Sequence, residues 1–363
     1  MGENQLSQVS SLPKHDDEID LKELIVALWQ GKFIIIVTTV ICAAIAVVYA
    51  LNAKEVWTAE ALITQPQISD FSDYQKMVSE FQPVFDVYQV GGDIRVSSSL
   101  DRFVLPQTLF SIYVQEFESR KNRKAYISML PEFQDELEGL RASGSEDIEL
   151  ALYARWDDRL SANLVKGSNS YVLTGMQSSS KGSYDLLNGY IQFVEGKARE
   201  RVIANLDSIV DGKRSSLIQQ KALLTDLATA HLDYELRRSK YALQIAKAAG
   251  INKPQQNLGD EELFAINIGA NALEAKVDVL EGLKELSVIE PRLQQIDSKL
   301  ALLKTSQVDS NISFDTFQFV EEPEKPISRT SPKRALIAML GVLLGGMLGC
   351  AIVLIRYAFK SKE

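Results

Sequence analysis

The chain has 363 residues, of which 46% are hydrophobic, and its formal net charge is −9. No stretch forms a basic stripe, so the composition argues against nucleic acid as a partner. The two cysteines, Cys42 and Cys350, lie in uncharged runs and predict neither a disulfide in the polar part nor a zinc site. Those runs, residues 33–51 and 335–355, are each long enough to cross a bilayer core about 30 Å thick.

Basic residues around the first run predict the orientation of the chain. Lys14, Lys22 and Lys32 precede the run, whereas Lys54 alone follows it closely. Positive charge stays on the cytoplasmic side, so we expect a cytoplasmic N-terminus. The second run has about as many basic residues before it as after it, so it does not decide the orientation. The sequence therefore predicts a two-pass membrane protein with both termini in the cytoplasm and the polar middle outside it.

The segment before the first run predicts a juxtamembrane helix. Residues 20–23 have the pattern of a capping box, in which an N-terminal aspartate is followed three positions later by glutamate. The apolar residues here share one helical face: Leu21, Leu24, Ile25 and Leu28. Such a helix lies on the lipid surface or docks on a partner. Trp29 and Lys32 suit the membrane interface, which favours the lipid surface.

Small residues in the two runs predict close helix packing. Three glycines of the second run are four positions apart and share one helix face: Gly341, Gly345 and Gly349. Such a face lets two membrane helices approach closely, although a span that merely tolerates glycine gives the same pattern. The first run has a weaker stripe of small residues, formed by Cys42, Ala46 and Ala50.

Prolines stiffen the approach to the second run. Pro323, Pro326 and Pro332 fix their own backbone and keep the preceding residues extended. The segment is either a surface that a membrane partner contacts or a linker that stays taut. We predict that these prolines and the three glycines pack the spans and couple them to a partner in the membrane.

Three segments of the polar middle predict strands. They are rich in β-branched or aromatic residues and cover residues 56–64, 170–178 and 311–320. Helices are expected at about 70–82, at about 98–120, and from a cap at Ser145 to Gly167.

A helix of unusual length is predicted from residue 183 to about residue 249. This segment has no proline, and its apolar residues recur with a spacing of about 3.6. At about 1.5 Å per residue the helix would be about 100 Å long, so it must pack against another helix or another copy of itself. Residues 250–260 predict a turn, and helices over 261–286 and 287–304 return from it. The fold predicted is an α/β base with a long extended helical hairpin arm, anchored by two transmembrane helices.

The chain lacks the motifs of common catalytic and cofactor sites. It has no phosphate-binding loop, no HExxH motif and no GxSxG elbow, and its two histidines are His15 and His231. Basic residues 120–124 and the pair Asp157-Asp158 are interpreted as solvated helix surface rather than as an anion or metal site. We expect no catalytic residue, no cofactor, no metal and no enzyme activity.

Taken together, the ends and the middle of the chain resemble the Wzz chain-length determinant family of polysaccharide co-polymerases. The N-terminal part of the resemblance covers residues 20–24, Leu28-Trp29, Lys32 and residues 57–61. The C-terminal part covers Glu322-Pro323, Pro326, residues 331–333 and the glycine-rich span. A middle part covers residues 262–264, Gly269 and residues 272–275. Each motif is loose, but their order and distances are fairly specific.

The resemblance implies a non-enzymatic regulator of polysaccharide chain length in the bacterial inner membrane. It implies a ring-shaped homo-oligomer, with an octamer as the expected size. The glycan would be O-antigen or a related Wzy-dependent glycan such as enterobacterial common antigen. The protein would act with the Wzy polymerase on undecaprenyl-linked glycan, and the glycine and proline residues named above would be the candidates for coupling to that polymerase. A kinase-bearing branch is not expected, because the sequence stops at Glu363.

This interpretation divides the chain into five parts. Residues 1–32 form a cytoplasmic tail with the juxtamembrane helix, 33–51 the first transmembrane helix, 52–334 the periplasmic domain, 335–355 the second transmembrane helix and 356–363 a short cytoplasmic tail. Within the periplasmic domain, about 52–182 and 306–334 form the base and about 183–305 the arm. The alternative is a two-pass periplasmic sensor or scaffold protein.

Overall fold

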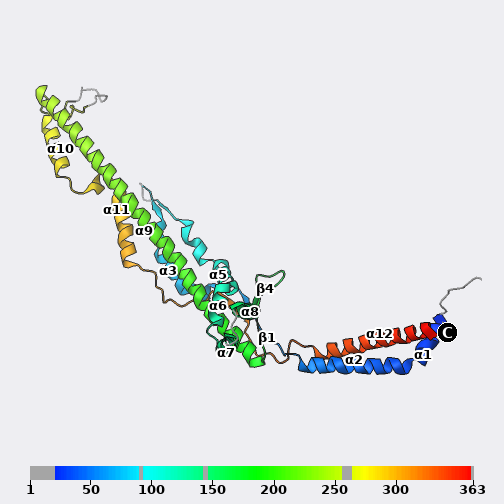
Figure 1. Cartoon of the computed structure of the whole chain (residues 1–363). Coiled ribbons are helices and arrows are strands. Elements are labelled where there is room, and N and C mark those ends of the chain that lie inside the picture. Colours follow the sequence, from blue (N-terminus) through cyan, green and yellow to red (C-terminus); the bar gives the residue numbers. More distant parts are fainter. Residues whose placement is uncertain (1–20, 90–92, 142–145, 256–263, 361–363) are drawn as a thin grey trace, which may run out of the picture. The chain divides into compact units, whose positions relative to one another are not determined.

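The computed structural model describes residues 21–89, 93–141, 146–255 and 264–360 (Figure 1). The predicted tail before residue 21, part of the turn at 250–260 and the motif residues 262–263 lie outside the described residues. The chain folds into two compact units. The span unit comprises the described residues up to 59, residues 175–187 and those from 324 onward. The other unit, called the arm unit, comprises residues 60–174 and 188–323 and so contains most of the base as well as the helical arm.

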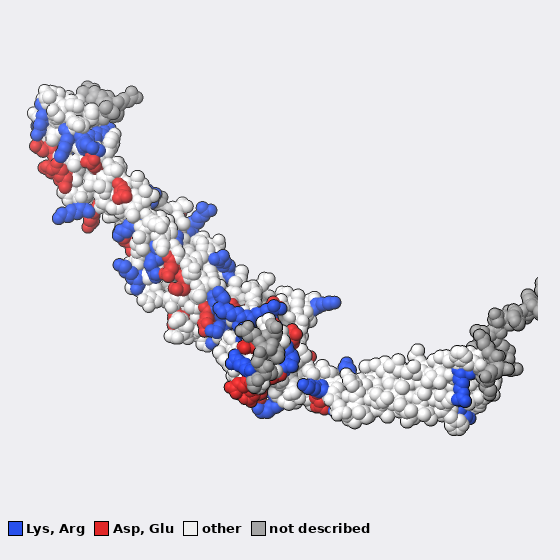
Figure 2. All heavy atoms as spheres, viewed as in Figure 1, with Lys and Arg blue, Asp and Glu red and all other residues white. Residues whose placement is uncertain are grey.

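Three helices dominate the span unit: α1 (Leu21–Gln30), α2 (Lys32–Asn52) and α12 (Arg334–Lys360). In the described part of the chain, α2 and α12 are the helices long and apolar enough to cross a membrane. They pack along one another, and Figure 2 shows that the surface over them is almost free of charged side chains between their ends. The two expected spans are therefore each contained in one helix.

The juxtamembrane helix packs against the second span. Gly31 ends α1, and a Cβ atom at this position would collide with the side chain of Val353 on α12. Ala27 and Val353 are both buried. At its C-terminal end, α1 thus contacts a helix of its own chain, while Trp29 stays exposed.

The base contains a four-stranded sheet of order β4-β5-β1-β6. Its strands are β1 (Trp57–Thr64), β4 (Leu160–Leu164), β5 (Tyr171–Gln177) and β6 (Gln318–Glu321). Strands β1 and β6 run antiparallel, with Ile63 opposite Phe319. The strands predicted at 56–64 and 170–178 are correct.

The strand predicted at 311–320 is correct only at its end, because β6 begins at Gln318. The residues before it pack as irregular chain into the aromatic core. Phe314 stacks on Tyr74 with ring centres 4.6 Å apart, and Phe317 lies 4.3 Å from Tyr113. Burial of these rings, and not strand pairing, explains the aromatic pattern of this segment.

The helix predicted from Ser145 to Gly167 is wrong beyond Asp157, where α8 (Glu146–Asp157) ends. Arg123 donates hydrogen bonds to the carbonyl oxygens of Asp157, the last residue of α8, and of Leu160, the first residue of β4, at 3.3 and 3.1 Å. Gly167 has φ +80° and forms the turn between β4 and β5. Leu160 continues the helical spacing but belongs to β4.

Short helices cover the rest of the base. In chain order they are η1 (Ile68–Phe71), α3 (Ser72–Glu80), α4 (Gln82–Phe85), η2 (Ser98–Val104), α5 (Pro106–Glu118), α6 (Arg120–Ile127) and α7 (Pro131–Arg141). A small hairpin, formed by β2 (Val87–Tyr88) and β3 (Ile94–Arg95), lies between α4 and η2 in the chain. Pro106 begins α5, where its missing N–H costs nothing, and the Ser119 side chain caps α6. The helices expected near 70–82 and 98–120 are confirmed, each as more than one element.

The predicted long helix is α9 (Ser180–Ala248), which has 69 residues. The chain returns along it as α10 (Ala270–Gly282), η3 (Leu286–Val288) and α11 (Arg292–Thr305), as Figure 1 shows. One face of α9 is buried together with apolar residues of α11 such as Leu293 and Ile296. Ion pairs also join the two sides of this hairpin: Lys221–Asp297, Lys240–Glu281, Lys247–Glu274 and Lys276–Glu235. The expected helical hairpin arm is therefore present.

Candidate functional site

The three glycines of α12 lie against α2. A Cβ atom at Gly341 would stand 2.5 Å from the Cβ of Ala46, and one at Gly345 would stand 2.7 Å from the Cα of Thr39. A Cβ atom at Gly349 would stand 2.7 Å from the Cα of Ile35. Real Cβ atoms do not approach other atoms so closely, so the two helices touch at their backbones only because these positions are glycine.

Small and hydroxyl residues of α2 form the other side of this contact. Cys42 and Ala46 of the predicted small-residue stripe both face α12 glycines. The Thr38 hydroxyl donates to carbonyl oxygens of its own helix at 2.9 Å and lies 3.4 Å from the carbonyl oxygen of Gly345. Gly346, next to the glycine face, meets nothing closer than the Thr39 hydroxyl at 3.9 Å. The glycines spaced four apart are thus packed against α2, whereas Gly346, which falls outside that spacing, has open space around it.

The proline approach is held to the chain that follows the first span. The backbone N–H of Val56 donates to the carbonyl oxygen of Ser331 at 2.9 Å, and Thr330 N–H donates back to Val56 at 2.8 Å. The hydroxyl of Ser180 donates to the carbonyl oxygen of Pro326 at 2.7 Å. Pro332 is buried. Pro326 and Pro332 therefore belong to the span unit, whereas Pro323 is the last residue of the arm unit.

An ion cluster joins the polar ends of the two spans, and the sequence analysis missed it. The Glu55 carboxylate accepts hydrogen bonds from Arg329 at 2.8 Å and from Arg334 at 3.0 Å. Arg334 also donates to the carbonyl oxygen of Ala50, at the end of α2. In the sequence, Arg329 and Arg334 count only as positive charge before the second uncharged run. The available signal is Glu55, an acidic residue shortly after the first uncharged run and opposite in charge to the arginines before the second.

The basic residues 120–124 and the pair Asp157-Asp158 prove to be partners. Arg123 and Asp157 form an ion pair at 3.1 Å, with side chains 17% and 21% exposed, and Arg120 approaches Asp157 at 3.7 Å. The expectation of a solvated surface is therefore wrong for Arg123 and Asp157. Their charges neutralise one another at the junction of α6 and α8, which supports a structural role.

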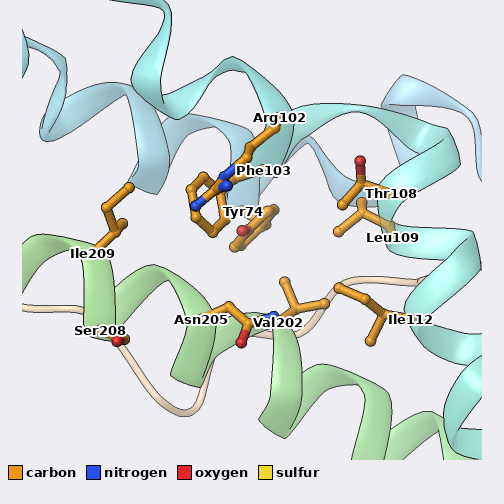
Figure 3. Close-up of a pocket in the computed structure, with 10 residues that line it drawn as sticks. All are labelled: Tyr74, Arg102, Phe103, Thr108, Leu109, Ile112, Val202, Asn205, Ser208 and Ile209. Atoms are coloured by element: carbon orange, nitrogen blue, oxygen red, sulfur yellow. The ribbon is translucent and has the colours of Figure 1, made fainter.

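The base has a cavity of about 600 Å³ between η2, α5 and α9 (Figure 3). Its polar groups are Arg102, Thr108, Asn205 and Ser208, and apolar side chains line the remainder. The Tyr74 hydroxyl has no hydrogen-bond partner among the described residues, and burial raises its pKa, so it stays a neutral phenol. These groups are suited to hydrogen bonding with a small molecule but supply no nucleophile with an adjacent base.

One carboxylate of the base has a shifted pKa. Burial raises the pKa of Asp315, and hydrogen bonding and charge from Glu195 raise it further, while Arg199 opposes the shift. Glu195 accepts a hydrogen bond from Arg199 at 2.7 Å. The described residues contain no group of three or more histidine, cysteine or acidic side chains that could hold a metal ion.

Comparisons with known proteins connect this architecture to a family. The model described as "Chain length determinant protein" matches residues 17–130, from before α1 to the end of α6. A chain length determinant protein of Escherichia coli (strain K12) is 30% identical over 357 residues, which cover 96% of this chain and 95% of the relative. The chain belongs to the chain length determinant (Wzz) family. The resemblance inferred from the sequence motifs is confirmed.

Two further comparisons cover nearly the whole chain. The ferric enterobactin transport protein FepE of Escherichia coli (strain K12) is 25% identical over 363 residues, which cover 96% of this chain and 91% of that protein. A solved full-length bacterial polysaccharide co-polymerase matches with a TM-score of 0.60 and 25% identity, covering 94% of this chain and 99% of that chain. A second model, for a G-rich domain described on tyrosine kinases, matches residues 293–358 and includes the glycine face of α12. The co-polymerase fold predicted from the sequence is thus confirmed.

Proposed function

We propose that this protein regulates the length of a bacterial surface polysaccharide as an oligomeric co-polymerase that acts with a Wzy polymerase. The observation that carries the proposal is the match to a chain length determinant over almost the whole of both chains. The match includes α2, the base, the arm and α12, which supports the proposal. The glycan is O-antigen or a related Wzy-dependent polymer such as enterobacterial common antigen, carried on undecaprenyl.

The protein lies in the bacterial inner membrane in this proposal, with most of the chain in the periplasm, and the two apolar helices support it. Residues 1–32 and 356–363 lie in the cytoplasm in this proposal, and residues 52–334 form the periplasmic domain. The lysines before α2 support this orientation, because positive charge stays inside. Residues 33–51 and 335–355 are the membrane-embedded parts of α2 and α12.

The glycines and prolines couple the protein to the polymerase by fixing the shape of the span pair. Because Gly341, Gly345 and Gly349 are covered by α2, they do not themselves offer a docking face. They set the distance between the two spans, and the segment with Pro326 and Pro332 holds the spans to the chain above them. The polymerase meets the outward faces of the pair, which are apolar and exposed.

A ring of identical copies covers the apolar residues that α9 leaves open, and an octamer is the proposed size. Several exposed apolar residues of α9 lie on one face at helical and heptad spacing: Leu227, Tyr234, Tyr241 and Ile245. Leu227 is 54% exposed. Exposed apolar surface of this extent in water indicates that another protein surface covers it. In a closed ring, a neighbouring copy covers it on every subunit.

The protein itself catalyses nothing in this proposal; the polymerase forms the glycosidic bonds. The cavity beside Tyr74 supports this division of labour, since its polar groups are suited to binding and not to nucleophilic attack. Purified protein that transferred or released sugar without polymerase would overturn this part.

Deletion of the gene in its own strain tests the proposal. We expect a narrow glycan length distribution to become broad on a gel, and a plasmid copy to restore it. An unchanged ladder would contradict the proposal, and recovery of a signalling partner in place of a polymerase would favour the sensor alternative. Growth on ferric enterobactin as the iron source should be unaffected, which separates this function from the one that the name of the FepE relative describes.

A further inference from the structure

Two hollows adjoin on the arm unit, between the β2–β3 hairpin and the helices α9 and α11. The larger has a volume of about 620 Å³ and the smaller about 440 Å³. They share Tyr88, Gln295 and Lys299 in their walls, so together they form one elongated depression, the arm groove. Its other polar side chains are Gln89, Lys213, Gln220, Arg292 and Ser298.

Two ammonium groups, those of Lys213 and Lys299, line the arm groove. Neither Lys213 nor Lys299 forms an ion pair within the described part of the chain. Lys299 donates to the carbonyl oxygen of Asp86, and burial lowers the pKa of its ammonium group; the charge of Lys213 lowers it further, while Asp86 opposes the shift. Two neighbouring ammonium groups repel one another, so an anion bound between them is attracted by both.

Two carboxylates lie near these lysines: Asp86, whose charge attracts Lys299, and Glu290, which pairs with Arg292. Asp86 is buried and accepts hydrogen bonds from the Gln82 side chain at 2.6 Å and from the Ser97 backbone at 2.9 Å. Glu290 binds Arg292 through two hydrogen bonds of 2.6 and 2.8 Å. Arg292 therefore contributes little net charge, and the two lysines are the groups that an anionic ligand would engage.

The remaining lining suits a sugar. Tyr88 is 37% exposed, and the ammonium nitrogen of Lys299 lies 5.3 Å from the centre of its ring. An exposed aromatic face packs against the C–H groups of a sugar ring, and glutamine amides such as those of Gln220 and Gln295 donate to and accept from hydroxyl groups. The two adjoining hollows match an extended chain better than a single small ion.

We propose that the arm groove binds an acidic oligosaccharide, with Lys213 and Lys299 holding a sugar carboxylate and Tyr88 packing against a sugar ring. This inference rests on the proposed function, because the growing glycan is the oligosaccharide that the protein would meet. Inorganic phosphate engages the same lysines but makes no use of Tyr88 or of the second hollow.

Calorimetric titration of the full-length detergent-solubilised protein tests the proposal with three probes. Hexagalacturonate supplies carboxylates on a sugar chain, maltohexaose supplies a neutral chain of the same length, and inorganic phosphate supplies charge alone. We expect hexagalacturonate to bind most tightly. K213Q and K299Q should each weaken its binding about tenfold, the size of one lost charge-assisted hydrogen bond. Y88L should weaken both oligosaccharides and leave any phosphate binding unchanged.

A matched control is K247Q, which removes a lysine of the same helix that pairs with Glu274 away from the groove. It should bind hexagalacturonate as the native chain does, and circular dichroism should show every variant folded. Equal binding of hexagalacturonate and maltohexaose, undiminished binding by K213Q and K299Q, or binding of phosphate alone would each overturn the proposal. Because binding is measured on purified protein and chain length in cells, a protein that controls the glycan ladder without binding hexagalacturonate would refute the groove and leave the proposed function standing.

Discussion

The pair of spans is packed with small side chains, whereas the base is packed with large aromatic ones. Where α2 meets α12, the contact is made by glycine, alanine, threonine and cysteine, and backbones touch. The base is filled instead by large rings, among them Tyr113, Phe117, Phe133, Trp156 and Tyr190, each almost completely buried. In water, burial of a large apolar side chain stabilises the fold directly. In lipid that term vanishes between helices, so close approach of small residues takes its place.

The largest expected effect is in the aromatic core of the base. Phe117 is 1% exposed and lies 4.7 Å from the ring of Tyr190. Phe117→Ala should lower the free energy of unfolding by about 3–5 kcal/mol, because it removes a buried ring and leaves a cavity. Denaturant titration of the full chain in detergent measures the change. Leu164→Ala, at a position 58% exposed, is the control and should change little; equal losses in the two variants would contradict the packing described.

The packing of α2 against α12 should be disturbed by a larger side chain on the glycine face. Gly345→Leu places a side chain where even a Cβ atom would stand 2.7 Å from the Thr39 backbone. We expect α2 and α12 to separate, at a cost of about 1–3 kcal/mol, while the periplasmic oligomer persists. Gly346→Leu is the matched control, since its neighbourhood is open. Disulfide cross-linking between cysteines placed on the two spans reports the separation, and similar behaviour of both variants would show the face to be passive.

The ion cluster at the ends of the spans should have a smaller effect. Glu55→Gln removes the carboxylate that binds Arg329 and Arg334, whose side chains are each about a third exposed. Solvent screens such pairs, so the expected loss is about 1 kcal/mol or less and should shrink as salt is added. Thermal unfolding at low and high ionic strength measures it. A loss that does not depend on salt would indicate a steric and not an electrostatic role.

The smallest effect concerns pH. The pKa of Asp315 is raised in the folded chain by burial and by Glu195. In the window just above the ordinary aspartate pKa of ~4, the folded chain therefore binds more protons than the unfolded chain, and stability falls as the pH rises through it. Asp315→Asn should flatten this part of the stability profile and raise stability at neutral pH. Melting curves over a pH series test this, and an unchanged slope would argue against a role for Asp315.

The contrast between the regions also explains what the sequence could predict. The spans follow from uncharged length, and α9 follows from periodicity without proline, because both signals are local in the chain. The end of α8 is not visible in the helical spacing, and Arg123, which donates to the carbonyl oxygens of Asp157 and Leu160, comes from another helix.

Candidate sites were harder to predict for the same reason. The spacing of the glycines and the prolines was visible in the sequence, but their neighbours on α2 and at Val56 were not. Lys213 and Lys299 are far apart in sequence and meet only because α9 and α11 run side by side. A site assembled from several elements leaves no local pattern.

The length distribution of a glycan in a foreign host tests the central claim most directly. This chain would be expressed in a strain that keeps its Wzy polymerase but lacks its own chain length determinant. We predict that the broad ladder of the empty host becomes a narrow distribution with one mode, provided that the protein reaches the inner membrane. A ladder that stays as broad as in the host with empty vector, although full-length protein is present in that membrane, would contradict the account.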